Sequence, residues 1–233
     1  MDVCVAMCRS AAADGITHMV ATPHANDRYA FDREYSEELV AELQQRVGPA
    51  LTISLGCDFH LSYENLRDAL AHPARYAIAG GRYMLVEFSN YGIPQQIMDS
   101  LLRVGDCGIT PIVTHPERNP ILRESLPRVA EWAAQGCAIQ LTGSALTGSW
   151  GERSRRAAIW LLEHRAVHVL ATDAHDMTNR PPILSSARDA AAAICGEEVA
   201  DALVEANPRA IVANQPLPYF PEPLLTTYRK GSS

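Results

Sequence analysis

The chain has 233 residues, 47% of them hydrophobic, which is enough to bury one large core or two small ones. Its 27 acidic and 20 basic residues give a net charge of −7, which argues against a general nucleic-acid binder. No stretch approaches the roughly 20 apolar residues of a transmembrane span, and the first residues lack the basic segment of a secretory signal. We therefore expect a cytoplasmic protein whose six cysteines, none of them in a C-x-x-C pair, are reduced.

Strand-like and helix-like segments alternate along the chain. The predicted strands cover residues 16–22, 51–57, 83–88, 110–114, 138–142 and 167–172. The predicted helices cover residues 2–14, 33–47, 62–71, 94–106, 126–135, 152–165, 183–195 and 197–206. This alternation indicates parallel βαβ units, arranged either as a barrel or as a doubly wound sheet.

Metal-ligand residue types follow the apolar strands at the point where each strand ends. The carboxyl ends of parallel strands converge on one face of a barrel, so ligands that are distant in the sequence can meet there. The candidate ligands are His24, Asp58, Glu87, His115, Asp173 and His175. Imidazole and carboxylate together suit Zn, Mn or Fe better than a thiolate site does. The sequence therefore predicts a metal-dependent hydrolase.

Each of these residues also has a structural interpretation. His24 could be a capping or core residue, and Asp58 could cap the helix that starts near Ser62. Glu87 could form a salt bridge with an arginine such as Arg82 or Arg118.

Two arginines occupy the same predicted loops. Arg118 comes three residues after His115, and Arg180 comes five residues after His175. Because the guanidinium fork matches phosphate geometry, arginines around a metal cluster indicate a phosphoester substrate. Bound metals would activate water and polarise the phosphoryl group. The alternative is that each arginine pairs with a surface acid.

Several motifs in order resemble the CpsB/YwqE-type bacterial protein-tyrosine phosphatases of the polymerase-and-histidinol-phosphatase (PHP) superfamily. The motifs are Ala21-Thr-Pro-His24, Gly56-Cys-Asp58, Leu85-Val-Glu87-Phe-Ser89, Val113-Thr-His115-Pro-Glu-Arg118, Thr172-Asp-Ala-His175 and Arg180-Pro-Pro182. The resemblance implies an α/β fold, a distorted (β/α)7 TIM-like barrel, as one domain over residues 1–217, followed by a Pro-rich tail over residues 218–233. It also implies dephosphorylation of the phosphotyrosine tail of a tyrosine autokinase that regulates capsular or exopolysaccharide synthesis.

The resemblance further implies up to three divalent ions, manganese first, with iron, zinc or cobalt as alternatives. By position, His24 and His175 would share one metal. Asp58 would bridge two others, with Glu87 and His115 on one and Asp173 on the other. Arg118 and Arg180 would bind phosphate as catalytic residues.

The chain departs from the family pattern at its start and at Asp58. Family members open with a strand that carries a His-x-His pair, and this chain begins inside the first helix, so fewer ions are expected to bind. Asp58 stands where the superfamily usually has Glu. We expect the natural protein to begin roughly 20 residues earlier, the length of one strand and loop; the alternative is a truncated gene. A missing strand would leave an open edge that invites aggregation or pairing with another chain.

Two other functions remain open from the sequence. A phosphatase of the same superfamily that acts on histidinol phosphate or a sugar phosphate would use the same metals. A truncated, non-catalytic domain that binds the kinase tail or the polysaccharide machinery is the other alternative.

Overall fold

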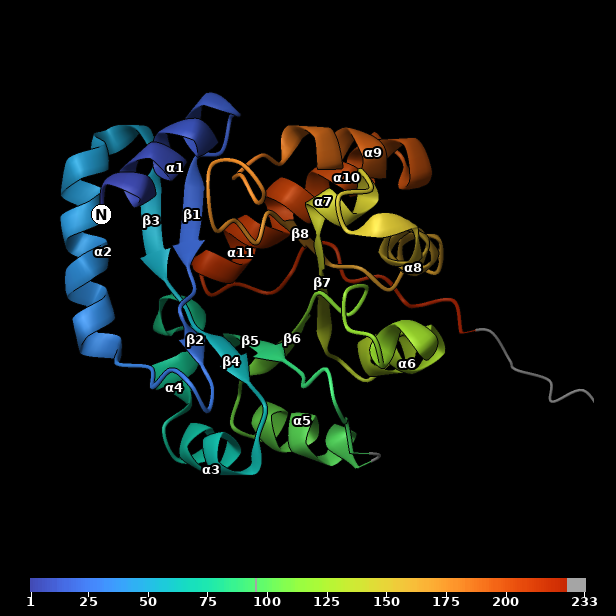
Figure 1. Cartoon of the computed structure of the whole chain (residues 1–233). Helices are drawn as coiled ribbons and strands as arrows, with labels where there is room; N and C mark the ends of the chain where they lie inside the picture. The colour runs from blue at the N-terminus through green and yellow to red at the C-terminus, as the bar shows by residue number, and fades with distance from the viewer. Residues whose placement is uncertain (95, 226–233) are drawn as a thin grey trace, which may run out of the picture.

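A computed structural model describes residues 1–94 and 96–225 of the chain. Its strands are β1 (His18–Ala21), β2 (His24–Ala25), β3 (Thr52–Leu55), β4 (Asp58–His60), β5 (Tyr83–Glu87), β6 (Thr110–Thr114), β7 (Ala138–Thr142) and β8 (Val169–Ala171). The strands β2-β4-β5-β6-β7-β8 form one parallel sheet in that order, and β1 pairs with β3 in a second parallel sheet (Figure 1). The predicted parallel α/β architecture is confirmed.

Helices follow most of the strands and cover their outer side (Figure 1). They are α1 (Asp2–Ala13), α2 (Arg33–Val47), α3 (Tyr63–Ala71), α4 (Pro73–Tyr76), α5 (Ile97–Asp106), α6 (Leu126–Ala134), α7 (Gly143–Leu146), α8 (Gly151–Glu163), α9 (Ser185–Cys195), α10 (Glu197–Asp201) and α11 (Asn207–Val212). Short 3-10 helices lie at Gly48–Ala50, Ile78–Gly80 and Leu122–Glu124, and a π-helical turn at Ala202–Ala206. The sequence did not predict α4, α7 or α11, which are four to six residues long and too short to show a helical period.

The expected barrel does not close among the described residues. β8 pairs only with β7, and β1 pairs only with β3. A cavity of ≈ 1170 Å³ is lined by residues of β1 and of β8 and reaches the strand ends. The Asp14 carboxylate, after α1, joins the two sides. It accepts the backbone N–H groups of Leu184 and Ser185 at the start of α9, at 2.7 and 3.0 Å, and the Ser185 hydroxyl at 2.6 Å.

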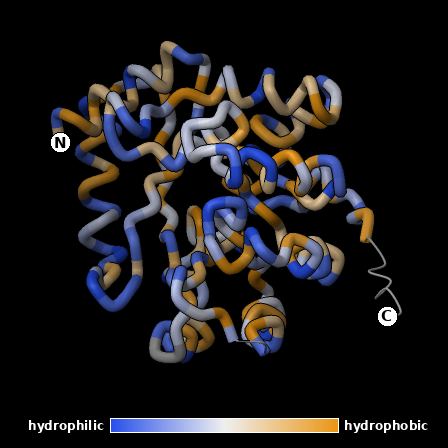
Figure 2. The backbone as a smooth tube through the Cα atoms, turned by 45° about the vertical axis from the view of Figure 1, so that its right-hand side comes forward, coloured by the Kyte–Doolittle hydropathy of each residue, from blue (hydrophilic) through white to orange (hydrophobic). Residues whose placement is uncertain are grey.

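The central strands are buried on both faces. Successive side chains of a strand point to opposite sides, so each strand contributes to a hydrophobic cluster on either side of the sheet. On β5, Met84 and Val86 belong to the large core cluster that packs against the helices. Tyr83 and Leu85 belong to a smaller cluster on the other side of the sheet. Apolar clusters on both faces of the sheet explain the nearly continuous apolar runs of these strands. Along the helices, hydrophobic and hydrophilic residues alternate, as Figure 2 shows by colour.

Two predicted strands are each broken in two. The segment 16–22 was expected to end before His24, and the segment 51–57 before Asp58. Instead, His24 and Asp58 lie in β2 and β4, which continue after bends at Pro23 and Gly56. A Cβ at Gly56 would stand 3.1 Å from side-chain atoms of both Val20 and Ile78, so a larger residue at this bend would push these neighbours aside by a few tenths of an ångström.

The described part of the predicted tail packs against the domain. The Asn207 side chain donates hydrogen bonds to the carbonyl oxygens of His168 and Tyr219, at 2.8 and 2.6 Å, and accepts one from the Tyr219 N–H at 2.9 Å. The Phe220 ring lies 4.2 Å from the buried imidazole of His168. The rest of the tail, residues 226–233, lies outside the described residues. No helix in the described ranges is long and apolar enough to cross a bilayer.

The buried His168 is expected to make stability depend on pH. Burial lowers the pKa of His168 from 6.5 to about 4, and its Nδ1 accepts the Ile139 N–H at 3.0 Å. Between pH 6.5 and pH 4, His168 is therefore protonated in the unfolded chain but not in the folded chain, and the free energy of unfolding falls as the pH drops through this range. By linkage the loss reaches about 2 kcal/mol at pH 5. His168→Asn keeps an acceptor for Ile139 but does not titrate.

Urea unfolding of both proteins at pH 7.5 and pH 5 measures this effect. The stability advantage of the natural protein over the variant should shrink by about 2 kcal/mol at the lower pH. An advantage that stays constant would show that His168 titrates normally in the folded chain.

Candidate metal centre

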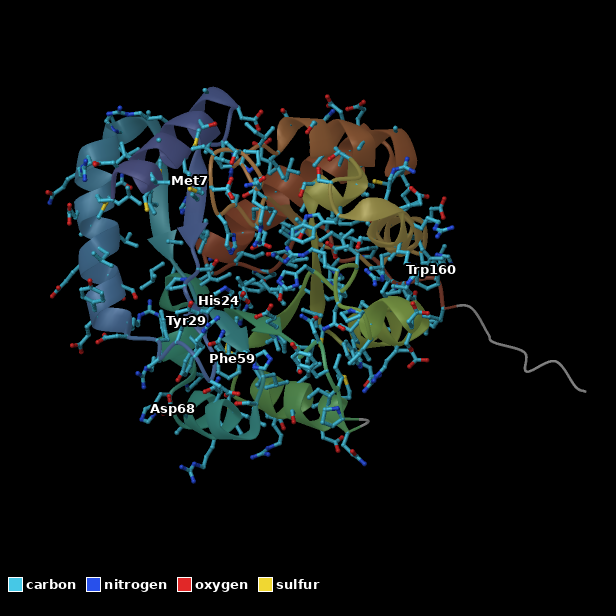
Figure 3. The ribbon with its side chains drawn as sticks, viewed as in Figure 1. Met7, His24, Tyr29, Phe59, Asp68 and Trp160 are labelled. Atoms are coloured by element: carbon cyan, nitrogen blue, oxygen red, sulfur yellow. The ribbon has the colours of Figure 1, made fainter. Side chains whose placement is uncertain are left out.

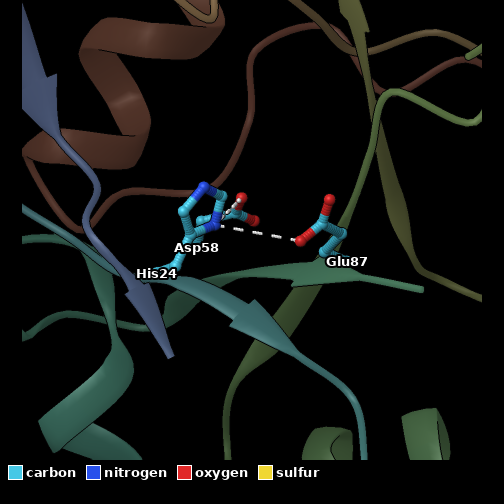
Figure 4. Close-up of side chains that lie close together, drawn as sticks. All are labelled: His24, Asp58 and Glu87. Carbon is cyan, nitrogen blue, oxygen red and sulfur yellow. Dashed lines mark ion pairs between the residues drawn. The ribbon is translucent and has the colours of Figure 1, made fainter. Parts of the chain in front are cut away.

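Three predicted ligands meet at the strand ends. β2 and β4 pair in parallel with His24 directly opposite Asp58, so the two side chains lie on the same face. Glu87 ends the neighbouring strand β5. His24 Nδ1 stands 3.0 Å from Asp58 Oδ2 and 3.9 Å from Glu87 Oε2. Figure 4 marks these two ion pairs with dashed lines. One ligand atom from each residue lies within 4.8 Å of the others, a spacing that a single cation can bridge.

His115 extends this group. It follows β6 directly, and its Nε2 stands 3.7 Å from Glu87 Oε1. Its backbone has φ +37°, a conformation that residues other than glycine rarely adopt, and its N–H is held by the carbonyl of Gln140 at 2.8 Å. Asp173, two residues after β8, also has a positive φ of +48°. Such backbone conformations cost free energy and persist only where the surrounding structure holds them, and they are found most often at functional sites.

Asp173 and His175 lie on the β8 side of the same site. The rings of His24 and His175 have their centroids 6.4 Å apart. His175 Nδ1 stands 3.8 Å from Asp173 Oδ1 and 3.0 Å from the Asp173 carbonyl oxygen. The six predicted ligands thus form two sets at the strand ends, which the neighbouring rings of His24 and His175 link: one of His24, Asp58, Glu87 and His115, and one of Asp173 and His175. His24 lies near the middle of the molecule in Figure 3.

Arg118 and Arg180, here called the arginine pair, both donate to Asp173. Each guanidinium contacts the same carboxylate oxygen, Oδ2. Arg118 also donates to Thr142 Oγ1 at 3.1 Å. The alternative interpretation was that each arginine pairs with a surface acid. Both arginines do pair with an acid, but this acid is largely buried: the Asp173 side chain is 18% exposed, and those of Arg118 and Arg180 are 16% and 25% exposed. Among the described residues, the ion-pair partners of Glu87 are His24 and His115, and no arginine forms a salt bridge with it.

The electrostatics of the site favour a bound cation. Burial, and then the charge of Asp58, raise the pKa of Glu87 to about 7, because two carboxylates compete in a poorly solvated place. The hydrogen bond to Asp58 raises the pKa of His24. Burial lowers the pKa of His115 to about 4, which keeps that imidazole neutral and able to ligate. Burial alone would raise the pKa of Asp173, but the adjacent arginines hold it below its ordinary value.

Two residues that support the site were not singled out from the sequence. Glu117 is fully buried, its Oε1 accepts the Thr142 N–H at 2.9 Å, and burial raises its pKa to about 7. Thr142 ends β7 and contacts Arg118. Thr142 could have been found because it occupies the same strand-end position as the ligands. Glu117 anchors the loop between His115 and Arg118 to β7.

Comparison with known proteins identifies the family. The family model described as "Capsular polysaccharide synthesis, CpsB/CapC" matches residues 1–213. The chain belongs to the CpsB/CapC family. The resemblance inferred from the motifs is thereby confirmed.

Similar proteins within the CpsB/CapC family include two tyrosine-protein phosphatases. CpsB of Streptococcus pneumoniae is 31% identical over 76% of this chain and 74% of its own length. YwqE of Bacillus subtilis is 28% identical over 76% of this chain and 70% of its own length. A solved structure described as belonging to the "unique metal-dependent tyrosine phosphatases" YwqE and CpsB superimposes with a TM-score of 0.86 at 25% identity, covering 94% of this chain and 89% of that one.

Proposed function

We propose that this chain is a metal-dependent phosphatase that hydrolyses phosphotyrosine. The observation that supports this most directly is the position of His24, Asp58 and Glu87, whose ligand atoms lie within 4.8 Å of one another, in the same group as the arginine pair. A cation cluster beside guanidinium groups is suited to an oxygen-rich anion such as a phosphoryl group.

The residues present fit a divalent ion. Asp58 Oδ1 is buried and has no hydrogen-bond partner among the described residues, although a buried carboxylate oxygen is costly to leave unpaired. The donors around it are imidazole nitrogens and carboxylate oxygens, which suit Mn, Fe, Zn or Co better than Mg. We propose manganese first. The resemblance implies that His24 shares a metal with His175. Because His24 Nδ1 lies 3.0 Å from Asp58 Oδ2, we propose instead that His24, Asp58, Glu87 and His115 would hold one ion, and that Asp173 and His175 would take part in a second.

The protein's own groups divide the work of hydrolysis. Divalent ions bound here would supply an acidified water molecule and polarise the phosphoryl group. The arginine pair would hold the other phosphoryl oxygens and stabilise the charge that builds on them in the transition state. Water attacks phosphorus in line and loses a proton. The bond from phosphorus to the tyrosyl oxygen breaks with its electron pair leaving on that oxygen, which takes up a proton, so the products are phosphate and tyrosine.

A cysteine nucleophile is not supported by the structure. Cys57, the cysteine adjacent to Asp58, is fully buried, and burial raises the pKa of its thiol, so the nucleophilic thiolate is not formed. We therefore propose direct transfer of the phosphoryl group to water, without a phosphoenzyme.

The proposed substrate is the phosphotyrosine tail of a cytoplasmic bacterial tyrosine kinase that regulates capsular or exopolysaccharide synthesis. The support is the family's description and the names of the relatives, which are tyrosine-protein phosphatases. The ligand residues and the arginine pair would equally serve a small phosphate ester, so the substrate must be measured.

Turnover of a phosphotyrosine peptide and of histidinol phosphate, each with added Mn²⁺ and with a chelator, tests this proposal. We expect the peptide to be the better substrate, chelation to abolish turnover, and Mn²⁺ to restore it better than Mg²⁺. Equal or better use of histidinol phosphate would overturn the substrate class. A folded, metal-loaded protein that hydrolyses neither would instead support the non-catalytic binding domain.

A further inference from the structure

The indole of Trp150 covers the arginine pair. The Cζ atom of Arg118 lies 3.8 Å from the Trp150 ring centroid, and that of Arg180 lies 5.3 Å from it. The same indole ring therefore lies against both guanidinium groups that share Asp173 Oδ2. Neither the metal ligands nor the phosphate-binding step proposed above explains why an indole stands there.

The loop that carries Trp150 is built to fix its ring. Gly148 and Gly151, on either side, have φ of +93° and +78°, which residues with side chains rarely adopt. The indole Nε1–H donates to Ser144 Oγ at 3.0 Å, and the Ser149 N–H donates to the Ser144 carbonyl at 3.0 Å. Ser144 lies in α7, which begins directly after Thr142, the other contact of Arg118. Indole and guanidinium are thus positioned from the same strand end.

Stacking suits an arginine that must bind an anion. Two adjacent guanidinium groups repel each other, and a ring face attracts both cations without using any N–H donor. The Nε atoms of Arg118 and Arg180 are buried and have no hydrogen-bond partner among the described residues. Arg118 and Arg180 each use a terminal N–H group to contact Asp173. Stacking uses none of the other in-plane donors, and the ring fixes the plane in which they lie.

We propose that Trp150 is a positioning residue, which holds the Arg118 guanidinium, and to a lesser degree that of Arg180, in the plane that receives phosphoryl oxygens. This inference rests on the proposed phosphate-binding role of the arginine pair. Trp150 acts through Arg118, so its loss weakens phosphate binding more than it affects the metal ligands.

Calorimetric titration of inorganic phosphate into the Mn²⁺-loaded protein tests the inference without requiring turnover. Trp150→Leu keeps an apolar side chain but loses the ring face, and should weaken phosphate binding about tenfold, the scale of a partly desolvated cation–π contact. Trp150→Phe keeps a ring face and should stay within about threefold of the natural protein. With a phosphate ester, KM should rise more than kcat falls. In an Arg118→Ala background, Trp150→Leu should cost much less than its tenfold loss in the unsubstituted protein, because only the contact with Arg180 remains.

Trp160→Leu is the matched control. Trp160 lies in α8, stacked on His164 with centroids 3.7 Å apart, and away from His24 in Figure 3. Its replacement should leave phosphate affinity unchanged. The chain has three tryptophans. Phosphate should alter the tryptophan emission of the unsubstituted protein, and Trp150→Phe should abolish that change.

Phosphate affinity that is unchanged in folded Trp150→Leu, or absent from the natural protein, would overturn the inference. Should Trp150→Leu not fold, Ser144→Ala decides the question. It frees the indole N–H and should weaken phosphate binding about threefold, the scale of one hydrogen bond, and an unchanged affinity would count against the inference. A protein that binds phosphate with this dependence on Trp150 but does not hydrolyse phosphotyrosine would contradict only the proposed function.

Discussion

Replacing Arg118 by alanine is expected to lower kcat/KM for a phosphotyrosine peptide by about 10²-fold or more, the scale of removing one charge-stabilising donor. The Arg118 side chain is only 16% exposed and lies between Thr142, Asp173 and Trp150. Water that fills the vacated space cannot supply a fixed positive charge. Steady-state kinetics at saturating Mn²⁺ measure the effect.

Two further variants show whether the loss comes from the guanidinium fork. Arg118→Lys keeps the charge but cannot form two parallel hydrogen bonds, so it should recover only part of the activity. Arg156→Ala, on α8, removes an exposed arginine that stands 3.8 Å from Glu152, and should leave the rate within about twofold. If Arg118→Ala is as active as this control, Arg118 has only a structural role.

Replacing Asp58 by asparagine is expected to weaken Mn²⁺ binding by at least about 10²-fold, since losing a ligand should cost more than losing an outer-shell partner does. Asp58 is 6% exposed. One of its oxygens lies 3.0 Å from His24 Nδ1, and the other has no hydrogen-bond partner in the part of the chain that the structure describes. The amide has the same shape but no negative charge. Calorimetric titration of Mn²⁺ into metal-free protein measures the affinity, and turnover should fall with it.

Asp68→Asn is the matched control for Asp58→Asn. Asp68 lies on α3, where it contacts Tyr76 and Arg75, and is well separated from His24 in Figure 3. This variant should bind Mn²⁺ as tightly as the natural protein does. Equal Mn²⁺ affinity in the two variants, with both folded by circular dichroism, would remove Asp58 from the proposed ligands.

The strand-end residues show how much of the site could be predicted from the sequence. Glu87, His115 and Asp173 each follow an apolar run, and an ionisable group in that position must find a partner once the strand is buried. Because parallel strands end on the same side, the sequence also predicts that these partners are one another. The structure brings Glu87 and His115 together, with 3.7 Å between Oε1 and Nε2, whereas the Asp173 carboxylate pairs with Arg118 and Arg180.

Other parts of the site depend on contacts that no local pattern encodes. His24 and Asp58 were expected in loops. Instead they lie paired in β2 and β4, because the two segments of the chain bend side by side at Pro23 and Gly56. Arg118 and Arg180 share one oxygen of Asp173, although Arg118 lies 55 residues before Asp173 in the sequence and Arg180 lies 7 residues after it. Trp150 comes from a turn whose glycines mark a bend but do not show what the ring covers.

The open side of the strand array shows a similar limit. Alternating strands and helices predict parallel βαβ units, and the structure has them. The same alternation does not say whether the last strand pairs with the first. Between β8 and β1 the described residues leave a cavity, and the hydrogen bonds of Asp14 to the start of α9 span it.

The most direct test of the central claim is anomalous X-ray diffraction at the manganese edge from crystals grown with Mn²⁺. The ligand atoms of His24, Asp58 and Glu87 should surround a peak at about 2 Å, the usual distance for imidazole and carboxylate ligands of a divalent ion. Phosphate added to the same crystals should lie between that peak and the guanidinium groups of Arg118 and Arg180. Manganese bound elsewhere, or no bound manganese in a protein that still hydrolyses phosphotyrosine, would contradict the metal centre described here.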